Sequence, residues 1–223
     1  MPKELQTLIS FFQDGGPFMY IILVVFAVGL AIALERLIYL SLVKSKNKKI
    51  WDQLFPMLGQ GKFRQAMDTA KDSNSAIARI MVYGLSRASH SNSFEDIEMA
   101  MEEGLMEITP QLERRTPYLN AFANIATLLG LLGTILGLIK AFTAVASADP
   151  SQKADLLSAS ISVAMNTTAF GLITAIPLLL AFSYLQSRTT ELVDSMEMAS
   201  VKFINVFREV QSKSAKKPQT PQQ

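Results

Sequence analysis

TLLGLLGTILGL (127–138) and NTTAFGLITAIP (166–177) are two apolar stretches that contain threonines and glycines but no acidic residue. Each lies inside a segment long enough to cross the hydrocarbon core of a bilayer, which takes about 20 apolar residues in a helix. A hydroxyl is tolerated there because it can bond a carbonyl of its own helix. A row of hydroxyls beside glycines has two interpretations: it lines an ion path, or it allows two helices to pack closely.

The composition favours a membrane protein with a substantial polar portion and excludes several classes of function. Of the 223 residues, 49% are hydrophobic and 18% are charged, and the net charge of +2 gives no sign of nucleic-acid binding. The chain has no cysteine, which excludes disulfides and thiolate metal sites. A single histidine and no phosphate-binding glycine loop predict neither an enzyme nor a protein with a cofactor or a resident metal.

The distribution of lysines predicts the orientation in the membrane. Residues 18–34 carry no charge, and a lysine cluster follows this first span, at Lys44, Lys46, Lys48 and Lys49. Because loops rich in lysine stay in the cytoplasm, this end of the span is predicted to face inward. Three spans then place the N-terminus outside and the C-terminus inside, with the short linker between the second and third spans outside.

We therefore predict an all-α membrane protein with three transmembrane helices and long cytoplasmic helical extensions. Helical periodicity continues through the polar region after the first span, with breaks at Asn47, 72–75 and 89–93. The predicted parts are an interfacial amphipathic helix (1–16), transmembrane helices (17–43, 118–147 and 156–186), a cytoplasmic helical domain (44–117), a periplasmic loop (148–155), a cytoplasmic helical tail (187–212) and a disordered tail (213–223).

Threonines and small residues form stripes along the second and third spans. Thr127 and Thr134 are seven residues apart, which is about two helical turns, so they share one face. The candidate ion-pathway residues of both spans are Thr134, Thr168, Thr167, Thr127, Asn166 and Ser162. The candidate helix-packing residues are Gly130, Gly133, Gly137, Gly171 and Pro177.

Neither of these spans supplies an acidic group. No Asp or Glu occurs between Glu113 and Asp149, or between Asp155 and Glu191. A machine driven by protons or sodium normally needs an ionisable group inside the membrane. If this chain conducts, a partner must therefore bring the carboxylate.

Three stretches of the sequence resemble the ExbB/TolQ/MotA family of proton- and sodium-channel subunits, and most of all its ExbB/TolQ branch. They are ALERLIYL (33–40), LERRTPYLNAFANIATLLGLLGTILGLIKAF (112–142) and NTTAFGLITAIPLLLAF (166–182). The resemblance implies an inner-membrane pentamer around two copies of an ExbD- or TolR-like protein, whose single span carries an Asp. It also implies that ion flow past this Asp drives a TonB- or TolA-like protein that works on the outer membrane.

By the same resemblance, Thr134 and Thr168 match the two pore-facing threonines of the family. Many ExbB and TolQ proteins carry a Glu five residues before the second of these threonines, and Val163 stands there in this chain. The polar groups of the third span are thereby shifted from a carboxylate towards hydroxyls. Transient Na⁺ at Thr134 and Thr168 stays open beside H⁺, which the branch favours, and the powered process stays open between Ton-like and Tol-like.

Charged residues at the span ends are predicted to lie at the membrane interface. Glu35 and Arg36 are expected either to anchor the first span as an ion pair or to contact another subunit. Arg114 and Arg115 are expected to pair with glutamates of the preceding helix or with lipid phosphates. Two other functions stay open: a non-conducting scaffold whose threonines only pack helices, and a small transporter, for which three spans are few.

Overall fold

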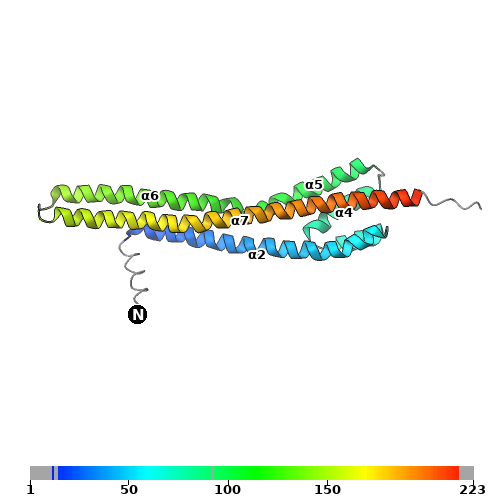
Figure 1. The fold of residues 1–223 in the computed structure, drawn as a ribbon, viewed down its shortest axis with the longest axis horizontal. Coiled ribbons are helices and arrows are strands. Elements are labelled where there is room, and N and C mark those ends of the chain that lie inside the picture. Colours follow the sequence, from blue (N-terminus) through cyan, green and yellow to red (C-terminus); the bar gives the residue numbers. More distant parts are fainter. Residues whose placement is uncertain (1–11, 13–14, 92, 216–223) are drawn as a thin grey trace, which may run out of the picture. The chain divides into compact units, whose positions relative to one another are not determined.

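The computed structural model describes residues 12, 15–91 and 93–215, and every regular element of this part is an α-helix (Figure 1). The helices are α2 (Pro17–Gly59), α3 (Phe63–Lys71), α4 (Ala76–Ala88), α5 (Phe94–Glu113), α6 (Thr116–Ser147) and α7 (Lys153–Ala215). The predicted interfacial helix lies almost wholly outside the described residues. Of the predicted disordered tail, 213–215 belong to α7, and the remaining residues lie outside the described part.

Three segments of the described chain are long and apolar enough to cross a membrane. They lie in Pro17–Gly59, Phe94–Ser147 and Lys153–Lys213. The predictions of an all-α fold and of three spans are confirmed. The chain is therefore a multi-pass membrane protein.

The contacts divide the chain into two compact units, which are described separately. Unit 1 comprises residues 1–36 and 115–185, and unit 2 comprises residues 37–114 and 186–223. The long helices α2 and α7 contribute to both units.

Unit 1 is a three-helix arrangement in which α6 and α7 form an antiparallel hairpin (Figure 1). The first half of α2 packs parallel to α7, and a Cβ on Gly29 would lie 2.8 Å from a methyl carbon of Leu178. From Thr116 to Gly133, the buried positions of α6 recur every three or four residues, at Thr116, Leu119, Ala123, Ala126, Gly130 and Gly133. Because most of these residues are small, the backbones of the hairpin can approach closely.

In unit 2, the structure corrects the predicted helix break at Asn47. Helix α2 continues through this residue to Gly59. The Asn47 side chain is buried, and its Oδ1 accepts a hydrogen bond of 3.2 Å from the backbone N–H of Ile77, in the first turn of α4. Asparagine favours helix ends because its side chain bonds backbone groups, and here it satisfies the end of another helix instead of ending its own.

The core of unit 2 is formed by α3, α4 and α5 together with the later parts of α2 and α7. Phe203 of α7 is fully buried, and a Cβ on Gly84 would lie 2.7 Å from Met101 and 3.2 Å from the Phe203 ring. Ser75 and Ser93 cap α4 and α5 by accepting bonds from Ala78 N–H and Asp96 N–H. These caps explain why the predicted breaks at 72–75 and 89–93 do separate helices.

Candidate functional site

The α6/α7 hairpin is built on glycines at its centre. A Cβ on Gly171 would lie 2.8 Å from the carbonyl oxygen of Ala126 and 3.1 Å from the Cα of Gly130. A Cβ on Gly130 would lie 3.2 Å from the Cα of Thr168. No larger residue fits between these backbones without separating the helices, so these glycines set the spacing of the hairpin.

Thr168 is the threonine that links the two helices. Its Oγ1 donates a 2.8 Å hydrogen bond to the carbonyl oxygen of Gly130, and its side chain is half-buried. A hydroxyl that donates its only proton still keeps lone pairs on its oxygen. Thr168 can therefore hold the helices together and also present an oxygen to a cation or to water.

Thr134 and Thr127 bond to their own helix instead. Thr134 Oγ1 donates to the carbonyl of Leu131 at 2.6 Å, and Thr127 Oγ1 donates to that of Ala123 at 3.1 Å. Both side chains are half-buried. Thr168 bonds to Gly130, and Thr134 lies one helical turn beyond Gly130 on α6. The two predicted pore threonines, Thr134 and Thr168, therefore lie within about one helical turn of each other in depth.

Thr167 has a different environment from Thr168. It is 2% exposed, and its Oγ1 lies 2.7 Å from the carbonyl oxygen of Gly15 and 2.9 Å from that of Val163. A Cβ on Gly16 would lie 3.6 Å from Val163. The segment before α2 is therefore held against α7, and the hydroxyl of Thr167 is used in holding it.

The remaining predicted residues of α7 lie on more open positions. Ser162 is exposed and Asn166 is half-buried. Thr174 was not among the predicted pathway residues, although it lies seven residues after Thr167. It is 1% exposed, and its Oγ1 has no hydrogen-bond partner in the described part of the chain. It therefore does not bond the carbonyl that Pro177 leaves without a donor.

An exposed amide pair on α6 was not among the predicted pathway residues, although Asn120 lies seven residues before Thr127, on the same predicted stripe. Asn124 Nδ2 lies 3.5 Å from Asn120 Oδ1, and both side chains are exposed. Their signal in the sequence was the four-residue spacing of two amides at the start of a span. Polar groups in membrane helices face a protein interior or a water-filled cavity, so this edge of α6 is suited to contact with something other than lipid tails.

The oxygen atoms of the hairpin are the only cation ligands that it offers. No group of three or more His, Asp or Glu side chains that could hold a metal occurs among the described residues. Hydroxyl and carbonyl oxygens suit hard cations such as Na⁺, and hydroxyls also suit a proton-conducting chain of water. The hairpin can assist passage of a cation, but between Glu113 and Asp149, and between Asp155 and Glu191, it contains no carboxylate that could bind and release a proton.

The junction between α5 and α6 brings two of the predicted interface residues together. Arg115 Nη1 lies 3.4 Å from Glu35 Oε1, so Arg115 pairs with α2. The glutamates of α5 were the expected partners, but Glu107 instead accepts bonds from Arg79 and from the Tyr83 hydroxyl. Arg36 is buried at 3% exposure, whereas Arg114 is exposed.

Arg115→Gly is expected to unfold at a higher temperature than Arg115→Ala. Arg115 has a φ of 69°, in the left-handed region. Both variants lose the ion pair with Glu35, but only glycine removes the backbone cost, roughly 1–2 kcal/mol. Thermal unfolding in detergent compares the two variants directly. Equal midpoints would show that the left-handed conformation costs nothing here.

The comparisons with known proteins bear on this hairpin. The sequence profile described as the MotA/TolQ/ExbB proton channel family matches residues 72–198, which is more than half of the chain and includes all of α6. A putative biopolymer transport protein ExbB homolog of Methanothermobacter thermautotrophicus is 27% identical over 86% of this chain and 67% of its own length.

Two further relatives carry names of the same group. A putative biopolymer transport protein ExbB-like 1 of Synechocystis is 28% identical over 91% of this chain and 80% of its own length. A Tol-Pal system protein TolQ of Haemophilus influenzae is 30% identical over 52% of this chain, and the match spans about half (49%) of that relative.

Proposed function

The chain belongs to the MotA/TolQ/ExbB proton channel family, and from this premise we propose that it lines an ion pathway with hydroxyl oxygens while a second protein supplies the carboxylate. The names of its relatives support the ExbB/TolQ branch and an energy-transducing channel subunit. This is a family of channel and transport subunits and not of enzymes.

The observation that carries the proposal is the combination of oxygens and missing acids in the hairpin. Thr134 and Thr168 offer hydroxyl oxygens at similar depth, and Asn120 and Asn124 continue the polar edge of α6. No acidic residue occurs in either span, and Val163 stands where the resemblance to the ExbB/TolQ branch implies a Glu. Proton transfer through a membrane needs an ionisable relay, so the pathway is complete only with a group from another chain.

The family supplies the form of the assembly that we propose. Five copies of this chain would surround a single-span ExbD- or TolR-like protein whose span carries an Asp, in the bacterial inner membrane. The lysines after the first span would place the N-terminus outside and the C-terminus inside. The motion would pass to a TonB- or TolA-like protein for outer-membrane transport or maintenance. H⁺ is the proposed ion, with Na⁺ as the alternative.

A second candidate function is a non-conducting scaffold, and one contact favours it. The hydrogen bond from Thr168 to Gly130 is the kind of contact that packs membrane helices. The free lone pairs of the same hydroxyl are what the channel proposal needs. The two functions therefore differ in whether the oxygen of Thr168 faces an ion, and not in the geometry of the hairpin.

Reconstitution with and without the partner tests the proposal. The chain is purified in two forms: alone, and together with the single-span, Asp-bearing protein encoded in the same genome. Each preparation is then reconstituted into vesicles that contain a pH-sensitive dye. We expect proton flux only when both proteins are present, and none when the partner's Asp is replaced by Asn. Flux through this chain alone would contradict the division of labour, and no flux with the intact partner would favour the scaffold. The same assay with a Na⁺-sensitive dye and an imposed Na⁺ gradient separates the two ions, and the scaffold is favoured only when neither ion flows.

A further inference from the structure

Unit 2 contains a cavity that the channel proposal does not use. Its volume is about 330 Å³, and it lies between α2, the start of α4 and the later part of α7. The charged, amide and aromatic residues that line it are Lys44, Lys48, Lys202, Glu191, Asn47 and Trp51.

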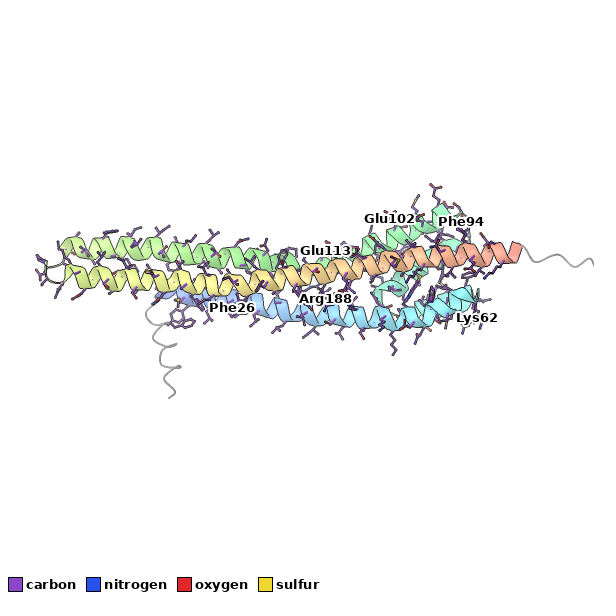
Figure 2. The ribbon with its side chains drawn as sticks, in the orientation of Figure 1. Phe26, Lys62, Phe94, Glu102, Glu113 and Arg188 are labelled. Atoms are coloured by element: carbon purple, nitrogen blue, oxygen red, sulfur yellow. The ribbon has the colours of Figure 1, made fainter. Side chains whose placement is uncertain are left out.

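The charges in this cavity leave an excess of positive charge. The negative charge of Glu191 is already balanced by two cations, because its carboxylate accepts bonds from Lys44 Nζ at 2.5 Å and from Arg188 Nη1 at 3.1 Å. The hydrogen bond from Lys44, followed by that from Arg188 (labelled in Figure 2), holds the pKa of Glu191 below its usual range, so this carboxylate stays ionised. Within the described residues, no acidic side chain forms an ion pair with Lys48 or Lys202.

Asn47 adds a buried donor without an acceptor. The residue is 3% exposed, and its Oδ1 is occupied by the N–H of Ile77. Its Nδ2 has no hydrogen-bond partner in the described part of the chain, although the residue lines the cavity. A buried donor left without an acceptor is destabilising. An anion in the cavity would supply the acceptor and would also neutralise the two free lysines.

We propose that this cavity binds a phosphate-bearing anion through Asn47, Lys48 and Lys202. A phosphate group has several acceptor oxygens, which suit one amide donor and two ammonium groups at once. Two sources share this chemistry: the headgroup of an acidic phospholipid and a soluble phosphate. A basic pocket that begins at the lysine cluster directly after a span suits the headgroup.

The tryptophan in the cavity wall allows binding of the anion to be measured by fluorescence. Trp51 is the only tryptophan of the chain, so the intrinsic fluorescence of the full-length protein reports on this cavity. In one arm, inorganic phosphate is titrated into the protein in a neutral detergent. In the other, the protein is placed in nanodiscs of phosphatidylcholine that contain increasing amounts of phosphatidylglycerol. We expect a saturable change in emission in at least one arm and none with phosphatidylcholine alone.

Three variants and one control test the residues that are named. Lys48→Gln and Lys202→Gln each remove one cation, and we expect each to weaken binding by about tenfold or more, the usual effect of losing a hydrogen bond to a charged group. Asn47→Asp keeps an oxygen for the N–H of Ile77 but places a negative charge beside the anion, so it should abolish saturation. Lys49→Gln is the matched control: Lys49 belongs to the same lysine cluster but lines a different cavity. It should change the affinity less than about twofold.

Each outcome supports or overturns the proposal. Saturation with phosphatidylglycerol alone identifies a lipid site, saturation with inorganic phosphate alone identifies a soluble ligand, and saturation with both identifies the shared phosphate chemistry. No emission change in either arm overturns the proposal. Equal weakening by Lys49→Gln and Lys48→Gln also overturns it, because that result indicates general electrostatic attraction. Far-UV circular dichroism verifies that each variant keeps its helices.

Discussion

Thr168→Val is expected to reduce partner-dependent proton flux by roughly 10- to 100-fold, the effect of losing a hydrogen bond to a charged species. Valine keeps the shape of threonine and removes the oxygen. The structural cost should be small, because the lost bond to Gly130 is of a kind that contributes on average about 0.6 kcal/mol in membrane proteins. Flux in vesicles and copurification of the partner measure the two effects separately.

Thr143→Val is the matched control for this substitution. Thr143 is on α6 and is exposed, and its hydroxyl bonds only its own helix, at the carbonyl of Ile139 (2.9 Å). It should leave both flux and assembly unchanged. If Thr168→Val conducts as well as the parent protein, the pore role of Thr168 is wrong. If it instead loses its oligomer or its partner, the residue acts in packing and the scaffold function is favoured.

Gly171→Ala is expected to destabilise the α6/α7 hairpin by roughly 1–3 kcal/mol, the usual range for overpacking. The added Cβ would lie 2.8 Å from the backbone oxygen of Ala126. A backbone atom cannot rotate away as a side chain can, so the whole of α6 must move. The displacement would also stretch the bond between Thr168 and Gly130. Unfolding in a graded series of denaturing and non-denaturing detergent measures the loss of stability.

Two other glycines provide a graded comparison for Gly171→Ala. At Gly29 the added Cβ would meet the side chain of Leu178, which can change rotamer, so Gly29→Ala should cost less. At Gly59 nothing lies within 4 Å, so Gly59→Ala should be neutral or slightly stabilising. If all three variants lose the same stability, the close approach at Gly171 does not determine the packing of the hairpin.

The transmembrane spans could be predicted from the sequence because the bilayer sets requirements that each segment must meet by itself. A helix in hydrocarbon must satisfy its own backbone and must be apolar for about 20 residues, and both requirements are visible in one continuous segment. Asn47 shows the limit of such reasoning. Its preference for helix ends is local, but its hydrogen-bond partner, Ile77, is 30 residues away and belongs to another helix.

The candidate site could be predicted only in part, for a related reason. Helical periodicity indicates which residues share a face, but not which neighbour that face meets. Thr167 and Thr168 are adjacent in sequence, yet one bonds the segment before α2 and the other bonds α6. Nothing in the residues around Gly15 predicts that its carbonyl accepts a bond from α7. The roles of these threonines in ion passage stay predictions.

The uninterrupted course of α2 and α7 through both units restricts how the length of this protein can vary. Both helices continue without a break where one unit ends and the next begins, at Arg36–Leu37 and at Leu185–Gln186. One residue inserted there would rotate everything that follows by about 100° and advance it by about 1.5 Å. The chain passes between the units a third time, from α5 to α6. This connection has no such restriction, because the helical backbone is already interrupted at Arg114 and Arg115. Insertions and deletions among homologues should therefore fall between helices, at 60–62, 72–75, 89–93, 114–115 and 148–152.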